Sequence, residues 1–310
     1  MKILLFGKNG QVGWELQRSL APLASTGELI ALGTDSQEIC GNLADPEGIR
    51  KTVQIVKPDM IINAAAYTAV DKAEKEFQLA QTINAHAPAV LAEEAGRLNA
   101  WLIHYSTDYV FDGSGDQPRT ETESANPLNV YGKTKLAGEQ NIIESNCRHI
   151  ILRTSWVYAT YGNNFIKTIL KLAQERDHLQ IVDDQIGAPT GAELIADVTA
   201  HIVRSLRNHA DNPTVSGLYH LTAKGCTSWH GFANFILRQA ATADVSLKTT
   251  PGNLYPIASA DYPTPALRPL NSRLNSEKLQ QTFNLYLPEW QDGVLRTLTE
   301  ILANRLSVVR

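Results

Sequence analysis

The short segment YGKTK places a tyrosine, Tyr131, four positions before a lysine, Lys135. The surrounding residues 129–144 follow a helical pattern, and a spacing of four puts both side chains on one helix face, about one turn apart. An ammonium group beside a phenol favours the phenolate, and so lowers the tyrosine pKa from about 10 toward the working range of an acid–base catalyst. In this composition a Tyr-x-x-x-Lys pair is expected roughly 0.4 times by chance, so the pair gains meaning only from the rest of the chain.

The segment GKNGQVG carries three glycines, Gly7, Gly10 and Gly13, between an apolar run at 2–7 and a helical pattern. Glycine permits a tight turn, lets backbone amides approach a pyrophosphate, and allows the helix to pack close to the strand. The spacing is G-x-x-G-x-x-G rather than G-x-G-x-x-G, and three glycines at this spacing are expected about 0.08 times by chance. We therefore predict a dinucleotide-binding turn here, and a purely structural turn is the alternative.

Two further segments follow apolar runs and carry residues suited to a ligand. NAAAYTAV (63–70) supplies small residues that let a cofactor lie against the backbone. HYSTDYVFDG supplies the hydroxyls of Ser106 and Thr107 at a strand end, where a parallel sheet binds its ligands. Each segment alone is commonplace, because small residues also serve helix packing and Ser-Thr pairs often end strands.

The first half of the chain alternates strand-like runs with helical patterns. Such alternation predicts a parallel sheet with helices on both faces and ligands at the carboxyl ends of the strands. The predicted fold class is α/β: a Rossmann-type doubly wound parallel sheet in an NAD(P)-binding domain at 1–158, then a smaller C-terminal α/β substrate domain at 159–310. Whether part of the second domain returns to the first sheet stays open. The predicted strands are 2–7, 28–33, 59–66, 101–107 and 149–158, and a predicted helix covers 81–99.

The second half of the chain is less regular. Its periodicity predicts helices, short strands and a proline-rich ordered loop. The helices are predicted at 163–177, 191–207, 228–241 and 289–306, the strands at 179–184 and 217–223, and the loop at 254–274.

Composition excludes several classes of protein. The net charge of −4, without a basic run, argues against a nucleic-acid partner. No apolar run approaches the roughly 18 residues of a membrane span, and the apolar start of the chain is too short for a signal peptide. Three widely spaced cysteines, Cys40, Cys147 and Cys226, cannot all pair within the chain, so we expect a reducing cytoplasm.

The order of glycine turn, strand-end hydroxyl and Tyr-x-x-x-Lys resembles the extended branch of the short-chain dehydrogenase/reductase superfamily. Within that branch the chain resembles the dTDP-4-dehydrorhamnose reductase family. The segments that carry this resemblance run from Gly7 to Glu300: GQVGWEL, NAAAYTAVDKAE, HYSTDYVFDG, PLNVYGKTKLAGE, RTSWVY, GNNF, DDQIGAPTGAEL, YPTPALRPLNSRL and LPEWQDGV. Related sugar dehydratases carry Asp-Glu after the catalytic threonine, whereas this chain has Asp108 and Tyr109, which argues against a dehydratase.

The resemblance implies a reaction and its catalytic residues. Hydride passes from NAD(P)H to C4 of dTDP-4-dehydro-L-rhamnose, and the product is dTDP-L-rhamnose, a precursor of cell-surface polysaccharide such as lipopolysaccharide. Tyr131 is the implied proton donor, Lys135 lowers its pKa and holds the nicotinamide ribose, and Thr107 hydrogen-bonds the sugar oxygen.

The resemblance also implies residues that bind each ligand. Arginine forks suit a diphosphate, which supports the arginines of the substrate set. The implied cofactor-binding residues are Gly7, Gly10, Gln11, Val12, Gly13, Asn42, Leu43, Ala66, Tyr67, Thr68, Tyr105, Tyr131 and Lys135. The implied substrate-binding residues are Thr107, Asp108, Tyr131, Trp156, Asn164, Arg268 and Arg273.

One departure from the family pattern concerns cofactor choice. Members usually place an acidic residue at the end of the second strand, where it binds the adenosine ribose and repels a 2′-phosphate. Here Gly33 stands at that point and Asp35 follows two positions later. We therefore predict NADPH as the cofactor, with NADH tolerated.

The resemblance implies a magnesium ion at the contact of a homodimer, and Glu15, Glu193 and Glu300 match the positions. Carboxylates from distant segments suffice for magnesium, which usually keeps several waters. The alternative is that all three are solvated surface glutamates.

Two other functions stay open at this point. The fold can serve a reductase of another nucleotide-linked 4-keto-6-deoxysugar, since the sequence does not set the C4 configuration. It can also serve a non-catalytic, cofactor-binding regulatory subunit, against which the intact Thr107, Tyr131 and Lys135 argue.

Overall fold

A six-stranded sheet forms the centre of the computed structural model, which describes residues 1–24, 28–208, 215–243 and 245–308. All its strand pairs are parallel, as predicted for strand–helix alternation. The strands are β1 (Ile3–Phe6), β2 (Leu29–Leu32), β3 (Met60–Asn63), β4 (Trp101–Thr107), β5 (His149–Thr154) and β10 (Gly217–His220). Their order is β10-β5-β4-β3-β1-β2, a doubly wound arrangement in which the strand order reverses between the neighbours β1 and β3.

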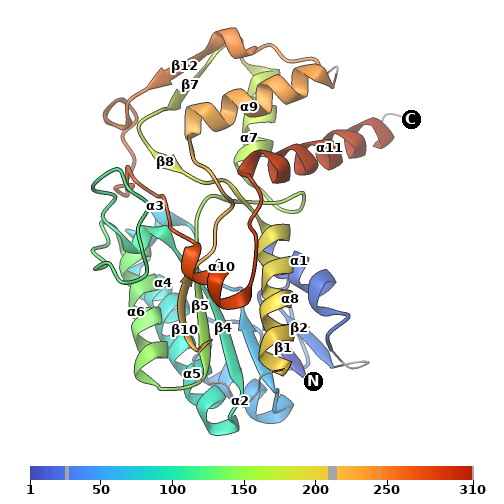
Figure 1. Cartoon of the computed structure of the whole chain (residues 1–310), viewed down its shortest axis with the longest axis vertical. Helices are drawn as coiled ribbons and strands as arrows, with labels where there is room; N and C mark the ends of the chain where they lie inside the picture. Colours follow the sequence, from blue (N-terminus) through green and yellow to red (C-terminus); the bar gives the residue numbers. More distant parts are fainter. Residues whose placement is uncertain (25–27, 209–214, 244, 309–310) are drawn as a thin grey trace.

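Helices cover both faces of the sheet (Figure 1). Successive residues of a strand point to opposite faces, so Ile3 and Leu5 of β1 join one core and Leu4 and Phe6 join the other. The first core also contains residues of α1 (Gln11–Leu20) and α8 (Ala192–Asn208). The second contains residues of α2 (Pro46–Val56), α5 (Ala87–Leu98) and α6 (Val130–Glu144).

The second half of the chain contributes to this sheet and also builds a unit of its own. β10 pairs with β5, and α10 (Glu277–Phe283) packs against the same core as α8. The remaining elements form a separate core in the upper half of Figure 1. They are α7 (Phe165–Glu175), α9 (Trp229–Thr242), α11 (Trp290–Val308) and the parallel pair β7 (Leu179–Val182) and β12 (Leu254–Ile257). Short pairs join β6 (Val157–Tyr158) to β9 (Thr190–Gly191) and β8 (Ile186–Gly187) to β11 (Thr227–Ser228).

Three predicted elements differ from the structure, and two of them lie in or after the fifth predicted strand. The predicted strand 149–158 ends at Thr154, because Trp156 has a φ of 47° that no strand residue adopts. The predicted loop 254–274 begins with a real strand, β12, which β7 pairs along its full length. Among the described residues, no helix is both long and apolar enough to cross a membrane.

The predicted helix 81–99 is three elements rather than one. A short helix, α4 (Phe77–Gln81), passes into a π-helical turn at Thr82–His86 before α5 begins, and α3 (Val70–Ala73) precedes α4. Asn84 lies buried in the π turn, and its side chain bonds both the backbone N–H and the carbonyl of Tyr67. It also donates to the Thr134 hydroxyl on α6. The π turn therefore ties the segment after β3 to the helix that carries Tyr131.

Candidate active site

In the glycine turn, Gly7 and Gly13 are needed for close packing, whereas Gly10 has room for a side chain. Gly7 has a φ of +90°, and a Cβ there would lie 2.6 Å from the backbone nitrogen of Ala65. A Cβ on Gly13 would lie 1.9 Å from the carbonyl oxygen of Gly7. At Gly10 the nearest atom would be 3.4 Å away, an ordinary contact. Gly10 is the N-cap of α1, and no side chain of the described residues caps that helix start, which leaves its N–H groups available to an anion.

A cavity of about 400 Å³ opens beside this turn, and we call it the first cavity. It gathers most of the predicted cofactor residues, while Gly13 packs behind it and the Tyr67 hydroxyl turns away to donate to Glu76. The predicted residues that line it are Gly7, Gly10, Gln11, Val12, Asn42, Leu43, Ala66, Thr68, Tyr105, Tyr131 and Lys135. Lining residues that the sequence did not single out include Asn9, Thr34, Gly41, Ala64, Ala65, Ile83, Thr154 and Val157.

Two hydroxyls support the first cavity as a ligand site. Ser106 Oγ and Thr154 Oγ1 are buried and have no hydrogen-bond partner within the described residues. Both residues line the first cavity, at the ends of the neighbouring strands β4 and β5. A buried hydroxyl without a partner costs free energy, so these groups fit a polar ligand such as a nicotinamide ribose. The sequence prediction missed Thr154, because the predicted strand 149–158 continued past it, whereas β5 ends at Thr154.

The three predicted catalytic residues come from β4 and α6. Thr107 is the last residue of β4, and its hydroxyl accepts from the Tyr109 N–H and donates to the Asp108 carboxylate. Tyr131 and Lys135 lie on α6, whose start is capped by Asn129, and both line the first cavity. The Tyr131 ring meets that of Tyr109 edge-on, with 5.6 Å between ring centroids.

The pKa of Tyr131 differs from the sequence prediction. Burial raises the pKa of Tyr131 to about 12, the Thr107 hydroxyl opposes this rise, and the Asp108 carboxylate adds to it. The Lys135 ammonium is not among these causes, and Lys135 Nζ donates to the Tyr105 carbonyl at 2.6 Å. Within the protein's own groups, burial therefore outweighs the predicted lowering by Lys135.

Lys135 is itself displaced from its ordinary titration range. Its side chain is buried, and burial lowers the pKa of Lys135 to about 8, although the Glu139 carboxylate opposes this shift. Asp108 is also buried, which raises the pKa of its carboxyl group to about 6. Titratable groups with strongly shifted pKa values thus gather where the ends of β4 and α6 meet.

The far end of the first cavity lies beside the end of β2. Gly33 and Thr34 line it there, and Asp35 stands next to them outside the lining. Asp35 Oδ1 accepts from Asn9 Nδ2 at 2.9 Å and lies 3.5 Å from Lys8 Nζ. These two contacts lower the pKa of the exposed Asp35 carboxyl, the Asn9 hydrogen bond having the larger effect. An acid and a lysine therefore stand together at this end.

A second cavity, of about 870 Å³, lies between Tyr109 and the C-terminal unit. Among the predicted substrate residues its lining contains Arg268, which pairs with Asp71 at 2.8 Å. Side chains absent from the prediction form most of the wall, among them Phe165, His178, Gln185, Trp229, Tyr262 and Leu270. No spacing in the sequence links these positions, since they come from four separate segments.

Of the other predicted substrate residues, Tyr131 lines the first cavity, whereas the rest lie outside both linings: Thr107, Asp108, Trp156, Asn164 and Arg273. Trp156 stacks on Trp229, with ring centroids 3.6 Å apart, and so supports the wall of the second cavity from behind. Asn164 caps α7 and donates to Gln11 Oε1. Arg273 is held by the Asp116 carbonyl and by Asn271.

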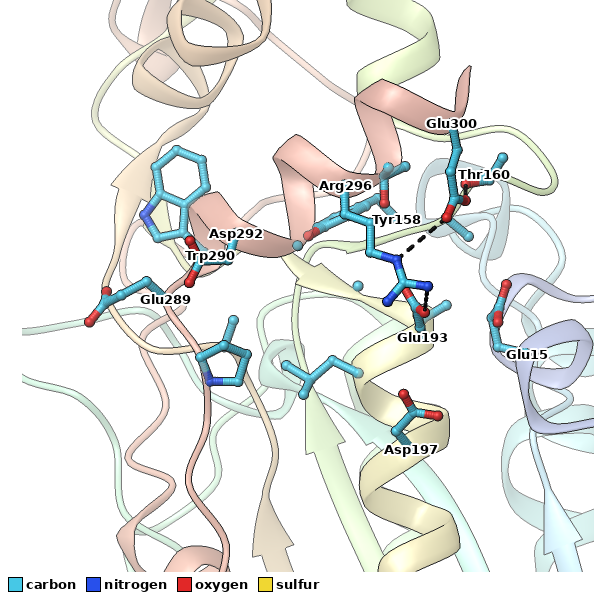
Figure 2. A pocket seen from close by; sticks show the side chains of 18 of the residues that line it. Glu15, Tyr158, Thr160, Glu193, Asp197, Glu289, Trp290, Asp292, Arg296 and Glu300 are labelled. Atoms are coloured by element: carbon cyan, nitrogen blue, oxygen red, sulfur yellow. Dashed lines mark hydrogen bonds and ion pairs between the residues drawn. The ribbon is translucent and has the colours of Figure 1, made fainter. Parts of the chain in front are cut away.

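The predicted magnesium site is not supported by the structure. Glu15, Glu193 and Glu300 do line one cavity, which α1, α8 and α11 surround. Figure 2 shows Arg296 reaching between Glu193 and Glu300, with Nη2 2.6 Å from Glu193 Oε1. Glu15 pairs with Arg18 at 3.1 Å. Among the described residues no group of three or more His, Cys, Asp or Glu is placed to hold a metal ion. At the three glutamates, guanidinium groups already supply positive charge.

Comparison with known proteins agrees with this arrangement. The family model described as RmlD substrate binding domain matches residues 1–303. The chain is 56% identical over 302 residues to a dTDP-4-dehydrorhamnose reductase of Salmonella typhimurium, covering 97% of this chain and 98% of that protein. Among solved structures, it is similar to a dTDP-4-dehydrorhamnose reductase of Clostridium acetobutylicum (TM-score 0.82, 36% identity, 97% of this chain and 99% of that one). It is also similar to the Bacillus anthracis enzyme in complex with NADP (TM-score 0.83, 33% identity, 97% and 100%). The chain therefore belongs to the RmlD family of dTDP-4-dehydrorhamnose reductases, in the extended short-chain dehydrogenase/reductase superfamily.

Proposed function

We propose that this chain reduces the C4 ketone of dTDP-4-dehydro-L-rhamnose to give dTDP-L-rhamnose. The observation that carries the proposal is that Tyr131 and Lys135 line the same cavity as the glycine turn. A proton donor and a dinucleotide-binding turn thus share one space, as a hydride-transfer enzyme requires. The 56% identity to a curated reductase supports the choice of substrate.

The first cavity is the proposed cofactor site. The N–H groups at the start of α1, beside Gly10, would hold the pyrophosphate. The free hydroxyls of Ser106 and Thr154 and the Lys135 amine would hold the ribose next to the nicotinamide. When bound, the reduced nicotinamide supplies the hydride for the ketone.

Tyr131 is the proposed proton donor. With a pKa of about 12, its phenol carries a proton at neutral pH and can give it to the sugar oxygen as negative charge develops there. Thr107 is rigidly placed, because its hydroxyl is fixed by Tyr109 and Asp108 at the end of β4. We propose that it orients the same oxygen.

The second cavity is the proposed site of the substrate nucleotide. Trp229 and Phe165 offer aromatic faces for a base, and Arg268 offers a fork for the diphosphate. Tyr109 lines this cavity and also contacts Tyr131, so a nucleotide sugar could extend from one cavity to the other. Arg268 is the stronger candidate of the two predicted arginines, because it lines the second cavity and Arg273 does not.

We propose that the cofactor is NADPH, with NADH accepted. Lys8 is available for a 2′-phosphate, whereas Asp35 suits a free ribose hydroxyl. The related enzyme from Bacillus anthracis is in complex with NADP. A site with both charges should discriminate weakly between the two cofactors.

We propose a cytoplasmic homodimer. Cys40, Cys147 and Cys226 are all free thiols, as a reducing compartment allows. Trp14 and Tyr161 form an exposed stacked pair, with ring centroids 4.4 Å apart, and exposed aromatic surface is typical of protein contacts. Analytical ultracentrifugation should give about twice the chain mass of 34.1 kDa, and a single-chain mass would contradict the dimer.

Turnover with a defined substrate tests the proposed reaction. The purified chain should oxidise NADPH only when dTDP-4-dehydro-L-rhamnose is added, and NMR should identify dTDP-L-rhamnose as the product. Turnover only with another nucleotide-linked 4-keto-6-deoxysugar would replace the substrate and keep the chemistry. Cofactor binding without turnover on any such sugar would favour a regulatory subunit.

A further inference from the structure

A line of three buried polar side chains leads from β3 to the proposed catalytic lysine. Asn63 ends β3, His104 lies within β4, and Lys135 projects from α6. His104 Nδ1 lies 3.1 Å from Asn63 Nδ2, and His104 Nε2 lies 3.2 Å from Lys135 Nζ. The motifs of the sequence assign no role to Asn63 or His104.

The direction of each hydrogen bond in this line follows from one backbone group. The Ala65 N–H can only donate, and it lies 3.1 Å from Asn63 Oδ1. The amide nitrogen of Asn63 is therefore the group that faces His104, and it too can only donate. His104 Nδ1 must accept this bond, which assigns the ring proton to Nε2. Nε2–H then points at Lys135 Nζ.

An N–H aimed at Lys135 distinguishes between the two charge states of the lysine. A neutral amine has one lone pair, so it can accept from His104 while it donates to the Tyr105 carbonyl at 2.6 Å. An ammonium group has three donors and no acceptor, so two N–H groups would face each other in a buried place. Burial also keeps His104 neutral, since it holds the pKa of the imidazole well below its ordinary value.

The charged groups around Lys135 do not remove the preference for its neutral amine. Glu139 on α6 is engaged by Arg153 of β5 through two bonds of 2.6 and 2.9 Å. Asp108, which follows β4, lies toward Tyr131 and shifts the pKa of that residue. Burial lowers the pKa of Lys135 to about 8, in the direction that the hydrogen-bond line requires.

We propose that His104, held in one tautomer by Asn63, is a positioning residue that turns an N–H toward Lys135 and favours its neutral amine over its ammonium form. The proposal rests on the proposed role of Lys135 beside the proton donor. At lower pH Lys135 is an ammonium group beside the proton donor, and at higher pH it is a neutral amine. Lys135 would then change charge close to neutrality, where a lysine in water stays protonated.

NMR tests the proposal without any turnover. In the full chain labelled with ¹⁵N-histidine, the nitrogen shifts of neutral His104 report its tautomer, and loss of its signals in His104→Gln identifies them. We expect the Nε2–H tautomer. In chain labelled with ¹³Cε-lysine, the signal lost in Lys135→Met should titrate about two pH units below the lysine value of about 10.4. A Nδ1–H tautomer, or a Lys135 titration at the ordinary value, would overturn the proposal.

Asn63→Asp is the most specific variant, because it reverses the hydrogen-bond directions between the three side chains with little change in the shape of residue 63. One carboxylate oxygen still accepts from Ala65 N–H, while the other accepts from His104, which moves the ring proton to Nδ1. Nε2 then accepts from an ammonium. We expect the Lys135 titration, and the high-pH limb of kcat/KM, to rise by at least about one pH unit. An unchanged titration in both Asn63→Asp and His104→Gln would refute the role of His104.

Sugar turnover tests the proposed function, whereas the NMR signals of His104 and Lys135 test this proposal. A chain that reduces no sugar but shows the Nε2–H tautomer and the low Lys135 titration would contradict the reductase function and support the role of His104. An active reductase in which Lys135 titrates at the ordinary lysine value would support the proposed function and contradict the role of His104.

Discussion

The first cavity is lined by strand ends and backbone, whereas the second is lined by side chains from scattered segments. At the first, Gly7 and the start of α1 offer main-chain groups whose positions the sheet fixes. At the second, Tyr109, Phe165, Trp229 and Arg268 approach from four parts of the chain. Main-chain recognition leaves a glycine pattern in the sequence, while side-chain recognition leaves none. The comparison teaches that a cavity built from main-chain groups can be predicted from a local sequence pattern, whereas a cavity built from scattered side chains cannot.

The junction of the two cavities should show the largest effect. Tyr131→Phe removes the proton donor but keeps the ring that meets Tyr109, so kcat should fall by about 10²–10⁴-fold. Cofactor affinity, measured by fluorescence titration, should change little, because the phenol acts on the sugar oxygen. Tyr286→Phe, at an exposed tyrosine, is the matched control. If Tyr131→Phe retained most of the wild-type kcat with chemistry rate-limiting, the catalytic assignment would be wrong.

The backbone character of the first cavity is tested at Gly10. Gly10→Val puts a branched side chain at the start of α1, where a Cβ meets no close neighbour, so the fold should survive. Cofactor affinity should fall by about tenfold or more, equivalent to about 1.4 kcal/mol. Gly252→Val is the control, because that glycine also has room for a Cβ and lies in neither lining. Unchanged affinity by fluorescence titration would move the pyrophosphate away from this turn.

The side-chain character of the second cavity is tested at two arginines. Arg268→Gln should raise KM for the nucleotide sugar by about tenfold, as loss of one charge-assisted hydrogen bond predicts, with kcat nearly unchanged. Arg273→Gln should raise KM less, because Arg273 is held by Asp116 and Asn271. Steady-state kinetics with the sugar varied separates the two arginines. An equal or reversed order would mean that the second cavity does not hold the diphosphate.

The smallest effect is expected at the ribose end of the first cavity. Asp35→Ala removes the acid beside Lys8, so the preference for NADPH over NADH should increase a few-fold, as for an exposed charge. Lys8→Ala should shift the preference in the opposite direction. The ratio of kcat/KM for the two cofactors measures both. A large wild-type preference for NADH would show that Asp35 binds the ribose and that the predicted NADPH preference is wrong.

The local sequence pattern determined the framework of the first cavity. An apolar run, a glycine turn and a helix must pack as they do, because a side chain at Gly7 or Gly13 would overlap the backbone. Tyr131 and Lys135 share a helix face through spacing alone, and both line the first cavity. The alternation of strands and helices likewise predicted the parallel sheet. These features depend on residues close together in the sequence.

Contacts between distant segments decided the rest. β10 completes the sheet from the second half of the chain, and the π turn places Asn84 against α6. Arg296 of α11 pairs with Glu193 and Glu300, two of the three glutamates that resembled a metal site. In the sequence His104 is an ordinary strand residue, and only the structure shows the contact with Asn63 that fixes its tautomer. Each outcome depends on which polar group faces another across the fold, and burial then sets the charge of that group, so only the tertiary structure could decide it.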